Sequence, residues 1–293
     1  MKHKAGFVNI VGNPNVGKST LMNALVGERI SIITSKAQTT RHRIMGIVNG
    51  DDFQIVYSDT PGVLQPKYKL QESMLKFSTS ALTDADILLY VTDVFEDMKA
   101  NERFLEKVKK SNLPTFLVIN KIDQTQEDKL EQLFDRWKEE LPDAKIFPIS
   151  ALHKFNVDNL LSSIKDGLPE AEPFFAKDQL TDKPSRFFVT EIIREKILQN
   201  YSKEIPYSVE PVVEEFKDEP KLIRISALIN VERESQKGII IGHQGKALKK
   251  VGTDARKELE AFFGKKVFLQ MFVKVQKDWR SKDFNLKQFG YES

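Results

Sequence analysis

A glycine-rich loop near the start of the 293-residue sequence restricts its fold more than any other segment. Residues 12–19 read Gly-Asn-Pro-Asn-Val-Gly-Lys-Ser and fit the pattern G-x-x-x-x-G-K-[ST]. The loop follows an apolar run, Phe7–Val11, and precedes a helix-like stretch, Ser19–Val26. Backbone N–H groups in such a loop surround phosphate oxygens, and the helix N-terminus adds partial positive charge. We therefore expect an α/β domain that binds a phosphorylated ligand; the alternative, a ligand-free Gly-rich turn, gives the Lys-Ser pair no packing role.

The residues of this loop have separate tasks in phosphate binding. Lys18 is expected to reach the terminal phosphates, and the hydroxyl group of Ser19 is a candidate Mg²⁺ ligand. The predicted contact set is Gly12, Asn13, Pro14, Asn15, Val16, Gly17, Lys18, Ser19 and Thr20.

Short apolar runs alternate with helix-like stretches up to about residue 168. The runs are Phe7–Val11, Phe53–Tyr57, Ile87–Val91, Thr115–Ile119 and Ile146–Ile149, and the helix-like stretches are Ser19–Val26, Gln71–Leu82, Asn101–Lys110, Lys129–Glu140 and Val157–Asp166. Continuously apolar strands separated by helices are typical of a mostly parallel sheet covered on both faces. Residues 1–168 are therefore predicted to form a doubly wound α/β domain of the P-loop type.

Two polar segments that follow predicted strands bear on magnesium and on the base. Asp59-Thr60-Pro61-Gly62 places a carboxylate at the C-terminal end of a strand, where it can hold Mg²⁺ through water. Asn120-Lys121-Ile122-Asp123 follows the strand Thr115–Ile119. Guanine presents two adjacent donors that the Asp123 carboxylate can accept, whereas adenine presents an acceptor there. Asp123 thus favours GTP over ATP.

Further base contacts are expected around these segments. Asn120 is predicted to tie its loop to the phosphate loop, and the stem of Lys121 to cover the base. Ser150 and Ala151, after the strand Ile146–Ile149, are expected to offer a backbone N–H to the guanine carbonyl, and Leu152 completes this set. Each segment alone could be an ordinary strand-end loop, but their order and spacing together indicate a guanine nucleotide site.

A proline-containing stretch, residues 169–184, is predicted to be a linker to a more basic domain. The formal net charge of the chain is only +3, but residues 1–180 hold 23 basic and 25 acidic side chains, and residues 181–293 hold 22 and 17. From Ser235 to the end there are 13 basic and 6 acidic residues. Charge concentrated at one end favours a module that binds a polyanion.

The second domain, residues 185–293, is predicted to be α+β. A helix is expected over Phe187–Tyr201, strands over Val209–Phe216, Leu222–Val231 and Val267–Val275, and an amphipathic helix over Lys246–Phe263. A G-x-x-G turn precedes that last helix. A lone turn of this kind is a weak signal, but its setting resembles the type II KH module, which binds single-stranded RNA.

The predicted RNA contacts lie in and just after this turn: Gly242, His243, Gln244, Gly245, Lys246, Lys249 and Lys250. No Lys or Arg stands between the two glycines, so the phosphate charge must be met by Lys246 and its neighbours. For some of these lysines the alternative is an ordinary solvated face, because Glu258 and Glu260 share the helix.

With Gln38-Thr39-Thr40-Arg41 after the first helix, these motifs resemble the Era family of translation-factor-related GTPases over the whole chain. In that family a Thr of the first switch completes the Mg²⁺ shell, a role that the resemblance gives to Thr40, with Thr39 as the alternative. The implied magnesium ligands are then Ser19, Thr40 and Asp59. The resemblance also links Asn15 to a catalytic potassium ion, and the alternative is a residue that serves only the turn.

The same resemblance implies a function. It predicts a GTPase that binds GTP or GDP with Mg²⁺, contacts 16S rRNA near its 3′ end and assists assembly of the small (30S) ribosomal subunit as a monomer. The motifs alone indicate only a GTPase joined to an RNA-binding module. GTP binding is expected to order residues 34–43 and to alter the pose of the KH domain across the linker.

Val63 stands where Ras-like proteins place a water-orienting Gln. Because valine cannot position water by hydrogen bonding, catalysis is expected to rely on Mg²⁺, Lys18, Thr40, backbone amides and the potassium ion at Asn15. This predicts slow intrinsic turnover that a partner stimulates. Gln65 is a rival only through its proximity in the sequence.

Two other function classes stay open. The chain has no cysteine, which fits a reducing cytoplasm and leaves no thiol chemistry. A GTP-dependent RNA-modification factor would need a second set of catalytic groups, and a signalling GTPase at the inner membrane would place its basic end on anionic lipid as a peripheral protein.

The aromatic tail residues Trp279, Phe284, Phe289 and Tyr291 either stack on bases or pin the C-terminal segment to a core.

Overall fold

The computed structural model describes residues 3–97 and 101–291, which form two compact units. The first unit runs to Lys67 and continues over Gln71–Asp182, and the second comprises Tyr68–Leu70 and the chain from Lys183. The outermost residues of the two predicted domains, Met1–Lys2 and Glu292–Ser293, lie outside the described residues. Within the described part, no helix is long and apolar enough to cross a bilayer.

The first unit is built on a six-stranded sheet with the order β2-β3-β1-β4-β5-β6. Its strands are β1 (Lys4–Gly12), β2 (Ile44–Asn49), β3 (Phe53–Asp59), β4 (Ile87–Asp93), β5 (Thr115–Asn120) and β6 (Lys145–Pro148). All neighbouring strands are parallel except the edge strand β2, which pairs antiparallel with β3. The sequence pattern predicts the other five strands but not β2, because Gly46 interrupts its short apolar pattern.

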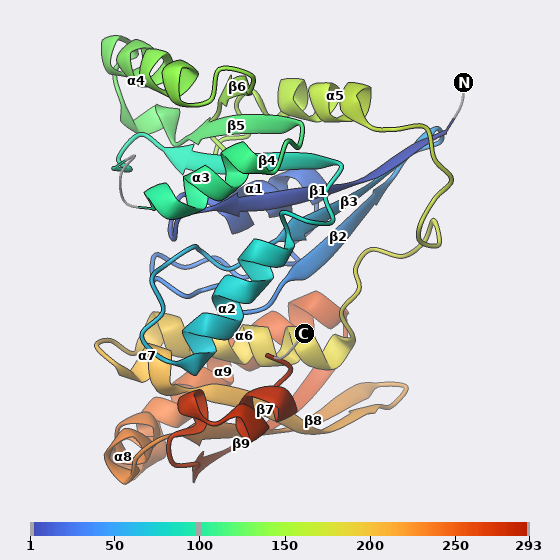
Figure 1. Cartoon of the computed structure of the whole chain (residues 1–293). Helices are drawn as coiled ribbons and strands as arrows, with labels where there is room; N and C mark the ends of the chain where they lie inside the picture. The colour runs from blue at the N-terminus through green and yellow to red at the C-terminus, as the bar shows by residue number, and fades with distance from the viewer. Residues whose placement is uncertain (1–2, 98–100, 292–293) are drawn as a thin grey trace. The chain divides into compact units, whose positions relative to one another are not determined.

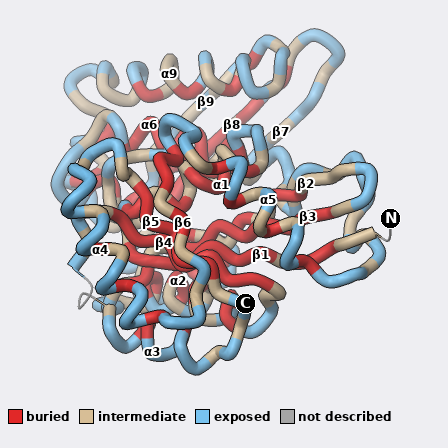
Figure 2. Tube along the Cα trace, turned by 90° about the horizontal axis from the view of Figure 1, so that it is seen from above, coloured by how far each residue is buried: buried red, intermediate tan, exposed pale blue. Residues whose placement is uncertain are grey.

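Helices cover both faces of this sheet (Figure 1). They are α1 (Lys18–Val26), α2 (Lys69–Ser80), α3 (Glu102–Lys110), α4 (Glu127–Glu140) and α5 (Val157–Gly167), with a 3₁₀ turn η1 (Ile122–Gln124) after β5. One core joins side chains of α3 and α4 and the end of α2 to alternate residues of β4 and β5. The opposite face of the same strands packs on α5, which is in turn next to α1. The strands therefore carry buried residues on both sides (Figure 2).

The predicted linker follows the surface of the first unit up to Asp182 and is held by hydrogen bonds. Pro169 O accepts from the Ala5 N–H at 3.1 Å, and the side chain of buried Gln54 binds the backbone of Phe174 and Phe175. At its far end, Leu180 O accepts from the Ile47 N–H at 2.8 Å. The last part of the linker thus runs along the free edge of β2.

The second unit packs helices on a three-stranded sheet with the order β7-β8-β9. Its elements are α6 (Ser185–Asn200), α7 (Ile205–Ser208), β7 (Glu210–Asp218), β8 (Leu222–Val231), α8 (Glu234–Ile241), η2 (His243–Gly245), α9 (Lys246–Phe263), β9 (Lys266–Val275), η3 (Trp279–Ser281) and α10 (Asp283–Gln288). Strand β7 is antiparallel to β8, and β8 is parallel to β9. One core contains apolar residues of α6, α8 and α9 and one face of the sheet.

Two of the C-terminal aromatic residues show the second of the two roles left open by the sequence, that of holding the C-terminal segment on a core. Trp279 is fully buried, and its Nε1–H donates to Ser208 O at 3.0 Å. Tyr291 is also buried and donates its hydroxyl proton to Glu210 Oε2 at 2.7 Å. These two residues pin the C-terminal segment to the second unit, whereas Phe284 remains 78% exposed.

Candidate functional site

The phosphate loop is shaped by two glycines that no other residue can replace without strain. Gly12 has φ 146°, and a Cβ there would lie 2.1 Å from Val91 O. Gly17 has φ 95°, and its Cβ would lie 2.2 Å from the Asn120 amide. Because both positions lie against neighbouring strand ends, the loop between them is fixed directly above the sheet.

Lys18 is buried within this loop, and its ammonium group is folded back onto the loop backbone. Its Nζ donates to Gly12 O at 3.1 Å and to Asn13 O at 2.7 Å. Burial lowers the pKa of Lys18 to about 8, although the charges of Asp59 and Glu96 act in the opposite direction. A buried cation whose two hydrogen-bond acceptors are neutral backbone carbonyls can exchange them for an anionic ligand such as phosphate.

Three side-chain oxygen atoms from three different segments of the chain meet next to Lys18, and one of them belongs to Ser19 in the wall of the cavity. Ser19 Oγ on α1 lies 2.8 Å from Thr40 Oγ1 and donates to Asp59 Oδ2 on β3 at 2.7 Å. Thr40 Oγ1 is 3.4 Å from the same carboxylate oxygen. Thr39, the alternative to Thr40, turns instead to Thr34 Oγ1 and Lys36 O, each at 2.6 Å.

This oxygen set fits a magnesium ion. Asp59 is fully buried, and its Oδ1 has no hydrogen-bond partner among the described residues. Burial raises the pKa of Asp59, while the hydrogen bond from Ser19 and the charge of Lys18 lower it. One carboxylate with two hydroxyl oxygens is the kind of hard donor set that Mg²⁺ takes together with phosphate oxygens.

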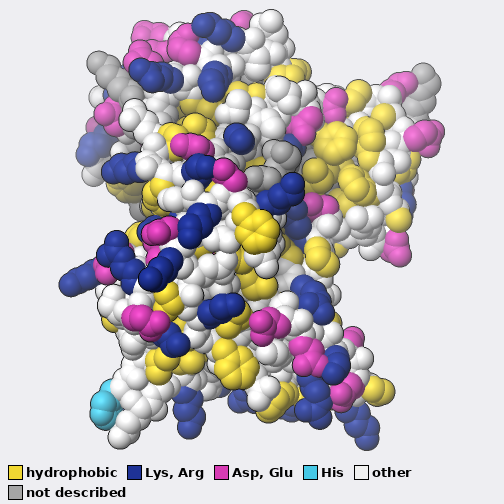
Figure 3. Space-filling model, turned by 60° about the horizontal axis from the view of Figure 1, so that its bottom comes forward, with side chains coloured by type: hydrophobic (Ala, Val, Ile, Leu, Met, Phe, Trp, Pro, Cys, Tyr) yellow, Lys and Arg dark blue, Asp and Glu magenta, His cyan; other side chains and the backbone are white. Residues whose placement is uncertain are grey.

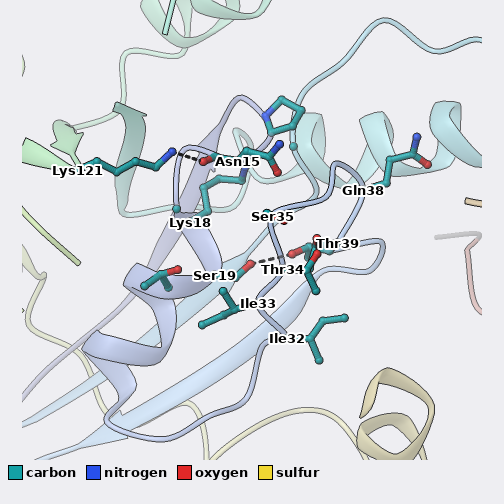
Figure 4. Close-up of a pocket in the computed structure, with 15 residues that line it drawn as sticks. Asn15, Lys18, Ser19, Ile32, Ile33, Thr34, Ser35, Gln38, Thr39 and Lys121 are labelled. Atoms are coloured by element: carbon teal, nitrogen blue, oxygen red, sulfur yellow. Dashed lines mark hydrogen bonds between the residues drawn. The ribbon is translucent and has the colours of Figure 1, made fainter. Parts of the chain in front are cut away.

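A cavity of about 410 Å³ opens beside these groups, which is within the usual size range of ligand pockets. The phosphate loop, the 32–40 segment, Gly62 and Lys121 line it. The Lys121 ammonium group donates to Asn15 O at 2.6 Å and pairs with Asp93 at 2.5 Å. The stem of Lys121 therefore lies along one wall of the cavity (Figure 4).

Asn120 connects the phosphate loop with the predicted base loop. Its Nδ2 donates to Val16 O at 2.8 Å, and its Oδ1 accepts from the Ala151 N–H at 3.0 Å. The Ser150 N–H donates to Phe155 O at 3.2 Å. Both N–H groups bind acceptors of the chain in this conformation, and the contact of Ser150 and Ala151 with the guanine carbonyl stays a prediction. Leu152 is 70% exposed beside them.

Asp123 lies in η1 with its carboxylate partly open to solvent. A hydrogen bond from the Ser150 side chain holds the pKa of Asp123 below its ordinary value, helped by nearby His153. The two side chains are 3.9 Å apart at His153 Nε2 and Asp123 Oδ2. The group is therefore an ionised acceptor at neutral pH, as recognition of two donors on a base requires.

The segment after Asp59 is tightly bound to the phosphate loop. Thr60 Oγ1 donates to Ile10 O at 2.7 Å, Pro61 O accepts from Ser78 Oγ, and a Cβ on Gly62 would lie 2.6 Å from Pro14 Cα. The Val63 N–H donates to Gly12 O at 3.1 Å. The side chain of Val63 is buried in the apolar core rather than turned toward the cavity.

Three polar residues of this region carry no motif. Asn101 Nδ2, at the start of α3, donates to Val63 O at 3.1 Å and binds Asn13 Oδ1. Burial raises the pKa of Glu96 to about 7, and its carboxylate accepts from the Thr92 hydroxyl at 2.5 Å. The third residue, Arg43, is the last of the 34–43 segment that GTP is expected to order. Only the Asn before a helical pattern offers a sequence signal, and that signal is one for capping.

The G-x-x-G turn of the second unit projects its variable residues outward. Gly242 has φ 70° and ψ 177°, a conformation open only to glycine, and Gly245 has φ 74°. His243 and Gln244 are both exposed between them. The turn therefore presents its two variable residues to solvent.

A groove of about 360 Å³ continues from this turn between α9 and β9. It is lined by Gly245, Leu248, Lys249, Gly252, Thr253, Arg256, Leu269 and Met271. Of the predicted contacts, Gly245 and Lys249 line this groove, whereas Lys250 does not. Arg256 adds a second cation to its lining. Figure 3 shows basic side chains mixed with acidic and apolar ones on the face that it draws.

Known proteins match both units and the whole chain. Residues 7–121 match the family model of a 50S ribosome-binding GTPase, and residues 204–280 match that of a KH domain. GTPase Era of Staphylococcus haemolyticus is 44% identical over 99% of this chain and 98% of its own length. The chain belongs to the Era family of GTPases.

Solved structures of Era support the same assignment. A single-site variant of Aquifex aeolicus Era bound to GDP and AlF₄⁻ is 40% identical, with a TM-score of 0.95 over 99% of this chain and 100% of its own. Era in complex with MgGDPNP and nucleotides 1506–1542 of 16S ribosomal RNA gives a TM-score of 0.96 at 40% identity over the same shares. The predicted fold class, a P-loop GTPase domain followed by a KH domain, is confirmed.

Proposed function

We propose that this GTPase binds 16S rRNA near its 3′ end through its KH domain and assists assembly of the small ribosomal subunit in a nucleotide-dependent way. The convergence of Ser19, Thr40 and Asp59 beside Lys18 carries the nucleotide half of the proposal. The RNA half is supported by the relative that holds a 16S rRNA fragment and by the groove beside Gly245.

Each predicted residue has one task in hydrolysis. Bound Mg²⁺ would supply positive charge for the β- and γ-phosphate oxygens. Ser19, Thr40 and Asp59 would hold that ion, and Lys18 would exchange its backbone acceptors for the phosphates. The loop amides stabilise charge on the phosphates because they are fixed before the ligand arrives. Asn15, with φ 66°, is the proposed potassium ligand.

Nucleotide state reaches the RNA module through the linker in this proposal. Thr181 Oγ1 donates to Met45 O at 2.7 Å, and the Met45 N–H donates to Asp182 Oδ1 at 3.0 Å. Met45 follows the 34–43 switch by two residues, and Asp182 precedes the first KH helix by three. A shift of the switch therefore has a hydrogen-bonded path to the start of the KH domain.

Binding and hydrolysis measured together test the proposal. The protein should hydrolyse GTP but not ATP, only with Mg²⁺, and should bind a 16S rRNA 3′-end fragment more tightly than a scrambled RNA of equal length at several salt concentrations. Lys18→Ala should abolish hydrolysis and leave RNA affinity of the nucleotide-free protein within about twofold. Equal binding to both RNAs and to anionic vesicles would instead favour a purely electrostatic membrane protein, and GTP-dependent RNA modification would favour the remaining alternative.

A further inference from the structure

Arg43 forms a closed polar cluster at the end of the switch segment. Its Nε donates to Ser58 Oγ at 2.5 Å, and its Nη1 donates to Asp84 Oδ2 at 2.6 Å. Its Nη2 donates to Asp84 Oδ1 at 3.0 Å and to Asn9 Oδ1 at 3.1 Å. The guanidinium thus grips one carboxylate with both terminal nitrogens, a geometry that lysine cannot reproduce.

The partners of Arg43 come from three separate parts of the first unit. Asn9 lies on β1 and Ser58 on β3, directly opposite each other in the parallel pairing, and both are fully buried. Asp84 lies between α2 and β4. Asn9 Nδ2 completes the cluster by donating to Ala81 O at 2.8 Å and Asp84 Oδ1 at 2.7 Å. The cluster therefore ties the switch to the sheet and to the chain that follows α2.

This cluster adjoins the proposed magnesium ligands along the chain. Ser58 immediately precedes Asp59, and Arg43 follows Thr40 by three residues. Arg43 also precedes Ile44, whose partner in the antiparallel pairing of β2 and β3 is Asp59 itself. One side chain thus holds both the end of the switch that carries Thr40 and the strand that carries Asp59.

We propose that Arg43 is a positioning residue for magnesium-dependent hydrolysis, an inference that rests on the proposed function of the nucleotide site. Its guanidinium holds the end of the switch against β1 and β3 and keeps Thr40 within reach of Ser19 and Asp59. Without it, the Thr40 hydroxyl must be brought to the ion from a looser segment. Within the described part of the chain, the hydrogen bonds of the cluster do not involve the phosphate loop or Asp123, so we expect nucleotide binding without magnesium to be unaffected.

The test is the magnesium dependence of GTP hydrolysis in the full-length protein. Arg43→Gln should raise the Mg²⁺ concentration for half-maximal turnover by about tenfold or more, as loss of a group that orients a metal ligand does. Turnover at saturating Mg²⁺ should return to within about threefold of wild type, and GDP affinity in EDTA should not change. Arg136→Gln on α4, an exposed arginine outside the site, is the matched control and should behave as wild type.

Further variants separate positioning from mere stability. Asp84→Asn should give the same shift in magnesium dependence, the double variant should add little to either change, and Arg43→Lys should be intermediate because it keeps the charge but not the fork. A lower melting temperature with unchanged magnesium dependence would overturn the inference, and so would a loss of turnover that Mg²⁺ does not restore. If Arg43→Gln does not fold, Arg43→Lys and Asp84→Asn carry the same test. Wild-type protein that fails to hydrolyse GTP would instead overturn the proposed function.

Discussion

Replacing Asp123 by asparagine tests which base the nucleotide site accepts. The carboxylate lies in η1 beside Ser150 and His153, and the Ser150 hydrogen bond keeps it ionised. Guanine would donate two N–H groups to this carboxylate. In Asp123→Asn one of those donors meets the amide NH₂, and the other loses a charged acceptor. Xanthine has a carbonyl oxygen in place of the exocyclic amine, so it can accept from the same NH₂.

The expected size of the effect follows from these two contacts. A hydrogen bond to a charged group contributes about 1.5–3 kcal/mol, and a donor left facing a donor costs about 1–3 kcal/mol. The side chain of Asp123 is 25% exposed, so solvent relieves part of both costs. We expect a loss of about 3–4 kcal/mol for GDP, which is roughly a 100- to 1,000-fold rise in Kd. Affinity for xanthosine diphosphate should rise by a comparable factor.

Equilibrium binding of GDP and xanthosine diphosphate to both proteins measures this exchange. Asp135→Asn removes one carboxylate from α4 without touching the cavity and serves as the charge control. GDP affinity within about threefold of wild type would refute the assignment of Asp123 to the base. Loss of GDP binding without any gain for xanthosine diphosphate would refute it as well, because the carboxylate would then act only by ordering Ser150.

Four other predictions follow from the geometry. GTP affinity should be constant below about pH 8 and fall by up to tenfold per pH unit above it, because the pKa of Lys18 is about 8 in the free protein and bound phosphate raises it. Titration calorimetry in two buffers should detect proton uptake on GTP binding above about pH 8 and almost none near pH 7. Thr181→Ala should reduce the ratio of RNA affinities in GTP and GDP while leaving hydrolysis of RNA-free protein unchanged; an unaltered ratio in filter binding counts against the linker path. Lys249→Ala should weaken RNA binding by about 3- to 10-fold and lower its salt slope by about one, whereas Lys217→Ala on β7 should not; equal effects would place the RNA elsewhere. Val63→Gln should not accelerate single-turnover hydrolysis, and because it buries an amide in the core it should lower the free energy of unfolding by about 1–3 kcal/mol relative to Val63→Ala. A tenfold faster rate would contradict the buried position of this side chain.

Most strands of the first unit were predictable because each is buried on both faces and reads as a continuous apolar run. Strand β2 was not, since it lies at an edge and contains Gly46, where a Cβ would come within 2.4 Å of Ile30 Cδ1. The linker is rich in prolines and polar residues, a composition that predicts only a connection between domains. Its hydrogen bonds to β1 and β2 link residues more than 100 positions apart, which no local pattern reveals.

The candidate site shows the same division. Lys18, Ser19, Asp59 and Asp123 stand in motifs because strand ends and loop turns fix their spacing along the chain. The resemblance gives the magnesium role to Thr40 with Thr39 as the alternative, and because the two are adjacent, only the fold of the switch shows which hydroxyl faces Asp59. The use of the Ala151 N–H by Asn120 was equally invisible, because it depends on how closely two loops approach.

At Val63 the backbone, rather than the side chain, faces the phosphate loop. The sequence identified a missing glutamine, but the valine side chain is only 3% exposed in the core and does not compete for the place of a water molecule. What meets the phosphate loop at this point is the peptide: the Val63 N–H binds Gly12 O, and its carbonyl binds Asn101. The missing hydrogen bond to water must then come from a group outside this position. A backbone held on both sides cannot supply it without moving, which is a physical reason to expect slow intrinsic turnover that a partner increases.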